Sequence, residues 1–167
     1  MSEQDLQAWA PLDGGCGCRH VRYRLVTAPL FVHCCHCRWC QRESRASCAL
    51  NAMIEADRVT VQDGEPDLID TPSASGYGQQ FARCPRCRIA VWSHYGSGNA
   101  ISFIRVGTLD MPDAVPPDIH IFTASKQPWV VIPEGVPAVP EYYDREQYWP
   151  QASLERRRAM LARLGRS

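Results

Sequence analysis

No apolar stretch in this 167-residue sequence approaches the roughly 20 residues that a membrane-spanning helix needs. A net charge is also lacking, because 18 lysines and arginines balance 18 aspartates and glutamates. A neutral chain gives no reason to expect nucleic acid or an anionic membrane as its main partner. The segment from Met1 to Ala10 is polar and acidic and lacks the basic-then-apolar pattern of a secretory signal. We therefore expect a cytoplasmic protein with neither nucleic-acid nor membrane partners.

Long helical stretches are scarce too, since many of the 13 prolines lie beyond residue 110, where they would break a helix. Short runs of β-type residues recur instead, separated by turn residues. We predict strands at residues 21–25, 30–32, 48–54, 59–61, 68–70, 76–81, 89–95, 101–106, 119–122 and 129–132. A turn is predicted at residues 13–15, and one helix at residues 153–164, capped by Ser153 and ended by Gly165. These signals predict a mainly β domain with a short C-terminal helix.

A disulfide framework is not indicated by the cysteine count, because such proteins usually carry an even number and this chain has nine. Thiols stay reduced in the cytosol, where clustered cysteines more often bind metal or react. Seven of the nine fall into three groups: Cys16 with Cys18, Cys35 with Cys37 and Cys40, and Cys84 with Cys87. Zinc prefers about four ligands in a tetrahedron, commonly thiolates. We therefore expect bound zinc.

The first and third groups together supply four thiolates. Two cysteines separated by one or two residues can reach one ion from a tight turn, which Gly17 relaxes in the first pair and Pro85 pre-sets in the second. A closed set of four is typical of a structural site, and its metal-binding free energy contributes to folding. The four-cysteine set is therefore predicted to hold a structural zinc ion; it consists of Cys16, Cys18, Cys84 and Cys87.

The middle group has three members, Cys35, Cys37 and Cys40, and no further cysteine pair remains to complete its shell. Three protein ligands with one open position are typical of a catalytic zinc site. Three thiolates make the ion a weak Lewis acid, but one that suits a further sulfur ligand. This three-cysteine set therefore predicts a catalytic site for a thiol-bearing substrate.

Several neighbouring residues leave alternatives open. His36 lies between two predicted ligands and would close the open position if it coordinated, and His33 is a second candidate for that role. Cys34 could replace Cys35 as a ligand or be a buried apolar residue, and Cys48 lies in an apolar run typical of a core. Both metal sites could also be structural, in a binding module that carries a thiol adduct or docks a protein partner. A redox role for Cys34 or Cys35 needs a metal-free thiolate, which nothing in the sequence demands.

Taken together, these motifs resemble the glutathione-dependent formaldehyde-activating enzyme family. The resemblance extends from about Asp13 to about Tyr143. It is carried by Gly15-Cys16-Gly17-Cys18, the run from Cys35-His36-Cys37 to Cys40-Gln41-Arg42, Phe81 with Cys84-Pro85-Arg86-Cys87, and residues 105–110, 117–121 and 126–129.

The resemblance implies an Mss4-like fold of small antiparallel sheets around one structural zinc ion at the four-cysteine set. It implies a second, more labile zinc ion at the three-cysteine set, next to where glutathione would bind. The implied activity is formation of S-hydroxymethylglutathione from glutathione and an aldehyde, formaldehyde, by a zinc-dependent enzyme of the carbon–sulfur lyase type.

Three parts of the chain are expected: a leader over residues 1–12, the zinc-binding domain over residues 13–143, and an extension with the helix over residues 144–167. Arg38, Arg42 and Arg105 are candidates to hold a substrate carboxylate, because arginine grips carboxylates in bidentate fashion. The simpler interpretation of each is an exposed surface charge. The oligomeric state is not determined by the sequence.

Overall fold

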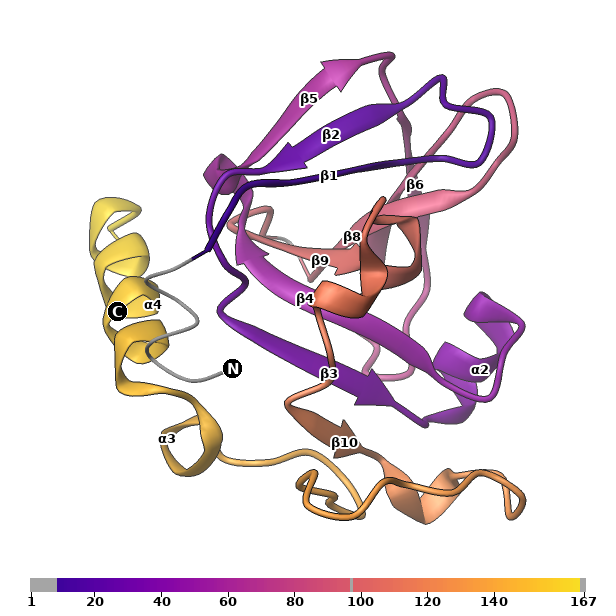
Figure 1. The fold of residues 1–167 in the computed structure, drawn as a ribbon, viewed down its shortest axis with the longest axis vertical. Helices are drawn as coiled ribbons and strands as arrows, with labels where there is room; N and C mark the ends of the chain where they lie inside the picture. The colour runs from indigo at the N-terminus through magenta and orange to yellow at the C-terminus, as the bar shows by residue number, and fades with distance from the viewer. Residues whose placement is uncertain (1–8, 97, 166–167) are drawn as a thin grey trace.

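The computed structural model describes residues 9–96 and 98–165, which form two β-sheets with helices at the periphery (Figure 1). The strands are β1 (Leu12–Gly15), β2 (Arg22–Leu25), β3 (Phe31–Cys35), β4 (Ala49–Glu55), β5 (Val59–Asp63), β6 (Asp67–Thr71), β7 (Gln79–Arg83), β8 (Ala90–Tyr95), β9 (Ile101–Arg105) and β10 (Ile119–Ile121). The α-helices are α2 (Arg38–Ser44), α3 (Arg145–Tyr148) and α4 (Gln151–Arg163). Short 3-10 turns occur at Ala56–Arg58, Val106–Thr108, Pro112–Ala114 and Thr123–Ser125. The prediction of a mainly β protein with a short C-terminal helix is confirmed.

The two sheets differ in size. The smaller has the order β1-β2-β5 and is antiparallel. The larger has seven strands in the order β10-β3-β4-β9-β8-β7-β6. Its terminal pair, β10 with β3, is parallel, whereas its other pairs are antiparallel. This pairing brings residues 119–121 beside residues 33–35, next to the cysteine-rich segment.

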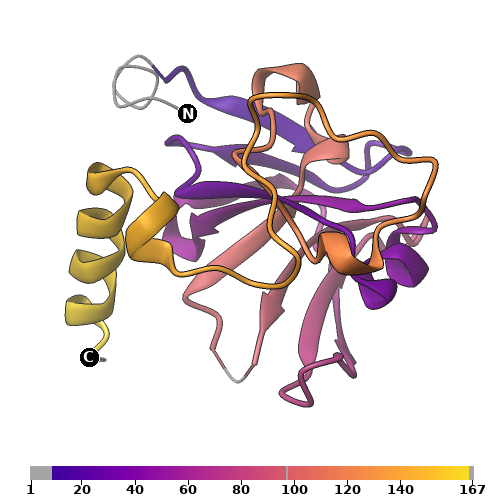
Figure 2. The ribbon, with the colours of Figure 1, turned by 90° about the horizontal axis from the view of Figure 1, so that it is seen from below.

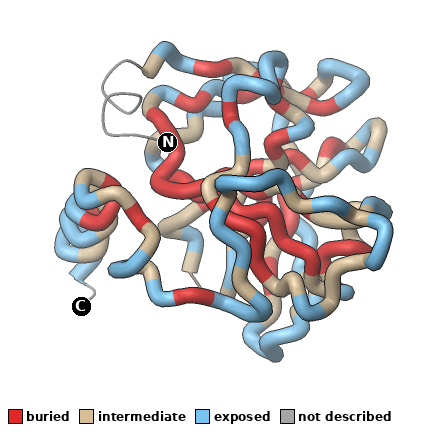
Figure 3. Tube along the Cα trace, turned by 60° about the horizontal axis from the view of Figure 1, so that its bottom comes forward, coloured by how far each residue is buried: buried red, intermediate tan, exposed pale blue. Residues whose placement is uncertain are grey.

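One core lies between the two sheets. It combines Tyr23 and Leu25 of the smaller sheet with Ala52, Trp92 and Ile104 of the larger one. The Tyr23 and Trp92 rings meet edge to face, with their centroids 5.5 Å apart. Figure 3 shows that buried residues concentrate in the strands at the middle of the molecule. Burial of such apolar surface is the main source of stability for a domain of this size.

A second core lies on the opposite face of the larger sheet, under the C-terminal segment. Phe31 of β3 packs there against Tyr143 and Trp149, with ring centroids 5.6 Å apart in each pair. Leu154 and Met160 of α4 are buried as well. The chain between β10 and α3 runs along the β3–β10 side of the sheet before α4 packs at one end of the molecule, while α2 lies at the other end (Figures 1 and 2).

The turn predicted at residues 13–15 is wrong, because these residues belong to strand β1. Glycine is needed here for close packing. A Cβ atom on Gly14 would lie 2.6 Å from the Tyr23 ring and 2.8 Å from the Thr108 carbonyl oxygen. The glycines therefore allow β1 to lie tightly against its neighbours, a use of glycine that resembles a turn signal in the sequence.

The C-terminal helix begins earlier than predicted. Pro150 occupies the N-cap position and the helix starts at Gln151, since proline is well suited to the start of a helix. Ser153 is therefore not the cap but lies inside the first turn, where it is completely buried. Gly165 does adopt the left-handed conformation, with φ of 63°, that ends many helices.

Two further differences concern short segments. Helix α2 lies within the cysteine run and was not predicted, because seven residues are too few to show a helical period. Residues 129–132 do not form a strand, and Trp129 and Val131 are 70% and 87% exposed. Among the helices in the described residues, none combines the length and apolar character that crossing a membrane requires.

Candidate metal centres and active site

The four-cysteine set is formed by two turns, one after a strand of the smaller sheet and one after a strand of the larger sheet. Cys16 and Cys18 follow β1, whereas Cys84 and Cys87 follow β7. The four sulfur atoms lie within 4.8 Å of one another. The Sγ atoms of Cys16 and Cys18 are 3.5 Å apart, and those of Cys18 and Cys84 are 3.7 Å apart. Sulfur atoms that share a tetrahedral zinc ion at ~2.3 Å stand about 3.8 Å apart, so the spacing fits this ion.

The same local backbone geometry presents both cysteine pairs. The amide of Arg19 donates to the carbonyl of Cys16, and the amide of Arg88 donates to the carbonyl of Cys84, each over 2.9 Å. Both arginines adopt the left-handed conformation, with φ of 59° and 62°. The Val21 amide also donates to the Cys16 sulfur over 3.3 Å. A hydrogen bond from the Ile89 main chain lowers the pKa of Cys87, which favours the thiolate form that binds metal.

The three-cysteine set lies where β3 gives way to α2. Cys35 is the last residue of β3, Cys37 is the N-cap of α2, and Cys40 lies in its first turn. Their sulfur atoms lie within 4.8 Å of one another, and the Cys40 amide donates to the Cys37 sulfur over 3.3 Å. Hydrogen bonds from Cys35 and Cys40 lower the pKa of Cys37, which is therefore the member most readily ionised.

Neither candidate histidine completes this set. The Nε2 atom of His36 lies 2.9 Å from Nδ1 of His120, in a different group of side chains. The Nε2 atom of His33 is 2.5 Å from the Tyr143 hydroxyl, which accepts a hydrogen bond from the Trp149 indole over 2.7 Å. Within residues 9–96 and 98–165, the set contains no fourth cysteine, histidine, aspartate or glutamate. Its donors are three thiols only, which is the donor chemistry of a zinc site with one further position.

Two tyrosines respond to charge at the three-cysteine set. Burial raises the pKa of Tyr95, and negative charge at Cys40 and Cys35 raises it further. Burial also raises the pKa of Tyr142, with a smaller contribution from Cys35. Tyr95 packs its ring on Phe103, with centroids 5.0 Å apart, yet stays 38% exposed. Both hydroxyls are thus protonated at neutral pH. The sequence did not indicate either tyrosine, because both are distant from the three cysteines along the chain.

Helix α2 also presents arginines to two grooves. A groove of about 630 Å³ is lined by Arg38, Gln41, Arg42, Arg45, Ala46, Ser47, Gln127 and Trp129. A second groove, of about 670 Å³, is lined by residues that include Arg42, Arg45, Arg83, Arg88 and Arg105. Arg42 is exposed and reaches both. Arg105 is instead largely buried and paired with Glu43, so it is not the exposed surface charge that the simpler interpretation assumed.

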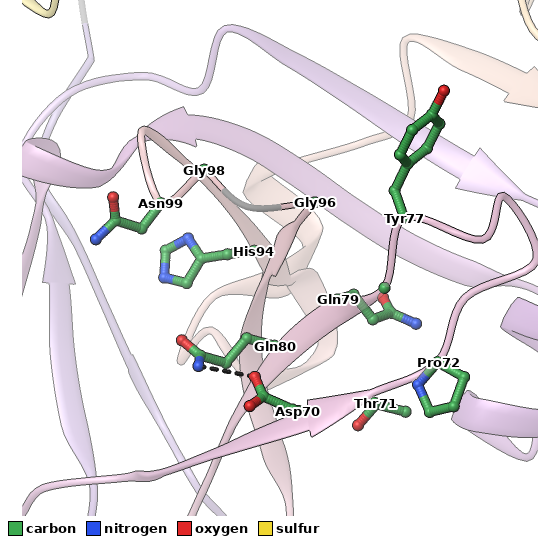
Figure 4. A pocket seen from close by; sticks show the side chains of 11 residues that line it. Asp70, Thr71, Pro72, Tyr77, Gln79, Gln80, His94, Gly96, Gly98 and Asn99 are labelled. Atoms are coloured by element: carbon green, nitrogen blue, oxygen red, sulfur yellow. Dashed lines mark hydrogen bonds between the residues drawn. The ribbon is translucent and has the colours of Figure 1, made fainter.

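A third hollow, of about 620 Å³, lies where β6 ends and β7 begins, beside the end of β8 (Figure 4). Its wall includes Asp70, Gln80, His94 and Asn99, and the Gln80 amide donates to the Asp70 carboxylate over 3.0 Å. None of the described cysteines lines it. Of the two grooves beside α2, the second is lined by Cys87, whereas Cys35, Cys37 and Cys40 line neither.

A third group of potential ligands was not anticipated. Cys34, His36 and His120 bring one sulfur and two ring nitrogens within 4.8 Å of one another, and all three residues are buried. From the sequence, Cys34 could be a ligand of the neighbouring set, a buried apolar residue or a redox thiol, and His36 could be a ligand of that set. No spacing rule could place His120 with them, because the contact depends on the parallel pairing of β10 with β3.

A mainly β protein with one group of four thiols and one of three defines a class whose sites are suited to zinc. The chain belongs to the glutathione-dependent formaldehyde-activating enzyme family, whose sequence model matches residues 11–125.

Two known proteins illustrate the similarity. The chain is 27% identical over 126 residues to a Halomonas elongata protein, which carries a provisional description as a glutathione-dependent formaldehyde-activating enzyme; the match covers 72% of this chain and 80% of that one. A crystal structure of a Rhodobacter sphaeroides protein, a structural genomics target, is 20% identical, with a TM-score of 0.46, and the match covers 59% of this chain and 88% of that one.

Proposed function

We propose that the protein catalyses the addition of the glutathione thiol to formaldehyde, giving S-hydroxymethylglutathione, at a zinc site held by Cys35, Cys37 and Cys40. The observation that carries the proposal is the convergence of three thiols, with no fourth ligand among the described residues. Membership of the family supports glutathione and formaldehyde as the substrates. The four-cysteine set would hold a structural zinc ion, because its donors already complete a tetrahedron.

Zinc at the three-cysteine set would supply one position for the substrate thiolate, since soft sulfur ligands suit this ion. In the reaction, a sulfur lone pair forms the new C–S bond while the carbonyl π electrons move to oxygen. The oxygen then gains the proton that the thiol has lost, so the reaction needs no oxidant or reductant. The reverse reaction breaks the C–S bond, as in a carbon–sulfur lyase.

Tyr95 is the side chain that we assign to the developing oxyanion. A tyrosine hydroxyl is protonated at neutral pH, and burial, which raises the pKa of Tyr95, does not change this. A protonated phenol can donate a hydrogen bond to the carbonyl oxygen as negative charge forms there. The exposure of Tyr95 leaves it accessible to a small aldehyde that arrives from solvent. Holding both reactants beside this hydroxyl replaces a chance encounter with an oriented one.

Arg38, Arg42 and Arg45 would bind the carboxylates of glutathione. All three are exposed, line the same groove and lie on or just after the helix that carries Cys40. The Nη1 atom of Arg38 donates to the Gln41 side chain over 2.9 Å, which leaves the rest of its guanidinium for a ligand. The Trp129 side chain on the opposite wall is largely exposed and can cover the backbone of a bound peptide.

The test measures S-hydroxymethylglutathione formation by NMR exchange spectroscopy, with and without protein. We expect wild-type protein to exceed the spontaneous rate and Cys37→Ser to lose the excess while keeping its circular dichroism spectrum. A wild-type rate equal to the spontaneous rate would reject the proposal and favour a non-catalytic binding module.

Two substitutions separate chemistry from binding. Tyr95→Phe should lower kcat by roughly tenfold or more with little change in the KM for glutathione, since it removes one hydrogen-bond donor. Arg42→Ala should mainly raise the KM for glutathione. Arg158→Ala is the matched control, because this arginine lies on the exposed face of α4 and pairs with Glu146.

A further inference from the structure

The two faces of strand β3 carry different potential ligands. Phe31, His33 and Cys35 face the second core, and Val32 faces the first. Because side chains alternate along a strand, Cys34 lies on the same face as Val32 and points away from the three-cysteine set. Cys34 is therefore unavailable to its neighbour's site and belongs to the opposite side of the sheet.

His120 reaches the same face from strand β10. It is the backbone partner of Cys34 in the parallel pair, and its neighbours Ile119 and Ile121 face the second core. His36, two residues beyond Cys34, is held by its amide, which donates to the Ile121 carbonyl over 2.9 Å. Three potential ligands thus converge from two strands and the turn that follows β3.

The convergence is close and shielded from solvent. The Cys34 sulfur lies 3.7 Å from Nε2 of His36, which lies 2.9 Å from Nδ1 of His120. The exposed fractions are 6% for Cys34, 0% for His36 and 6% for His120. The remaining ring nitrogen of His120, Nε2, is buried and has no hydrogen-bond partner among the described residues. The atoms that face one another, namely the Cys34 sulfur, Nε2 of His36 and Nδ1 of His120, are potential metal ligands, and all three residues are buried.

We propose that Cys34, His36 and His120 form a third metal site, which binds a borderline-soft divalent ion such as Zn²⁺. One thiolate and two imidazoles are ligands that zinc accepts readily. The three side chains would leave one position of the ion for a water molecule or another small ligand. The donor set is then one thiolate and two imidazoles.

The distances fit such an ion once the two imidazole rings turn toward it. Ligand atoms around tetrahedral zinc, with Zn–S of ~2.3 Å and Zn–N of ~2.0–2.1 Å, place sulfur about 3.6 Å and nitrogen about 3.3 Å from the next nitrogen. The sulfur–nitrogen distance already matches. The two ring nitrogens now face each other, with ring centroids 5.2 Å apart, so both rings need to turn toward the ion as well as separate by a few tenths of an ångström. On binding, the Cys34 thiol releases its proton, and the proton between the two ring nitrogens moves to the far nitrogen of its own ring.

The proposed site would stabilise the segment that carries the three-cysteine set. Cys34 directly precedes Cys35, and His36 lies between Cys35 and Cys37. An ion bound by Cys34 and His36 would therefore fix the backbone of this segment. The other face of the same backbone presents Cys35 and Cys37, two of the proposed catalytic ligands. It would also join β10, which is 84 residues away from His36 in the sequence, to this segment.

The experiment counts metal ions in full-length protein reconstituted with Zn²⁺ and, in parallel, with Co²⁺. We expect about three zinc ions per chain in wild type and about two in Cys34→Ala and in His120→Ala. The Co²⁺ form of wild type should show sulfur-to-cobalt charge-transfer and visible d–d bands whose intensity falls in Cys34→Ala. The matched control is His94→Ala, because His94 lies outside the cysteine groups and hydrogen-bonds the Ile101 carbonyl; this variant should keep the wild-type metal count and spectrum.

Cys34→Ala removes only one small sulfur atom, so it keeps the test valid where His120→Ala fails to fold. A metal count and Co²⁺ spectrum that do not change in Cys34→Ala would overturn the proposal. The readout does not depend on glutathione chemistry: absence of catalysis would reject the proposed function alone, and an unchanged metal count would reject the third site alone.

Discussion

The Arg105 guanidinium lies 2.7 Å from the Glu43 carboxylate, and this ion pair joins strand β9 to helix α2, which carries Cys40. Glu43 forms a second ion pair with Arg83 of β7. The two guanidinium groups lie 5.0 and 5.1 Å from the centre of the Phe81 ring, so each also gains a cation–π contact. One carboxylate thus compensates two cations and anchors the helix beside the three-cysteine set.

Glu43→Gln should lower the free energy of unfolding by about 1–3 kcal/mol, because it leaves two partly buried arginines without their counter-charge. The value is below that of a fully buried pair, since the Arg83 side chain is 27% exposed and screened by solvent. Urea denaturation measures it. Glu155→Gln, on the exposed side of α4, should change stability by less than about 0.5 kcal/mol. Equal effects of the two substitutions would contradict the anchoring role of Glu43.

A second anchor holds the C-terminal helix. Arg156 donates two hydrogen bonds to the Glu55 carboxylate, at 3.1 and 2.6 Å, and one to the Ala28 carbonyl at 2.9 Å. The Glu55 side chain is only 4% exposed. Arg156→Ala should therefore destabilise the protein by about 2–4 kcal/mol, since it leaves a buried carboxylate unpaired.

Arg158→Ala provides the comparison on the same helix, because both partners of its ion pair are more than half exposed. The expected loss is under about 1 kcal/mol. Thermal and urea unfolding of both variants test the difference. If Arg156→Ala and Arg158→Ala lower the free energy of unfolding equally, docking of α4 does not depend on the Arg156–Glu55 pair.

Metal removal should distinguish the sites. On titration with a chelator we expect the ion of the three-cysteine set to leave before that of the four-cysteine set, because the latter has a complete protein shell. The first loss should abolish any catalysis while far-ultraviolet circular dichroism stays constant. Loss of the ion of the four-cysteine set should unfold the chain, since binding at a closed site contributes to folding free energy. Simultaneous loss of both ions, or unfolding at the first step, would contradict this order.

Acid should weaken the contact between strand β2 and the segment after β9. The hydrogen bond from Arg22 lowers the pKa of Asp110 below its usual 3.8. Asp110 binds more protons unfolded than folded in this range, so its contribution is present above about pH 4 and is lost as the pH falls through its folded pKa. Asp110→Asn should cost about 0.5 kcal/mol at pH 7, a small value because the carboxylate is 44% exposed. The cost should vanish near pH 2, and a cost that stays constant with pH would exclude this electrostatic origin.

Local patterns were enough to predict most strands, because alternation of apolar residues and turn residues such as Asp63-Gly64 are properties of short segments. Two predictions, the turn at residues 13–15 and the start of the C-terminal helix, were wrong for other reasons. Gly14 and Gly15 look like a turn but allow a strand to approach Tyr23, and Pro150 replaces Ser153 as the start of a helix. At Gly14, packing against the distant residue Tyr23 outweighed the turn signal, and at the C-terminal helix the nearby Pro150 outweighed the cap signal of Ser153.

The sequence by itself determined the mainly β class, and the short spacing of its cysteines determined which thiols can meet within one turn. Tertiary structure alone decided that Cys16 and Cys84 approach from different sheets, that Cys34 faces away from Cys35, and that His120 joins His36. The physical reason is range. Spacing controls contacts between residues a few positions apart, whereas sheet order and strand direction decide which distant side chains share a face.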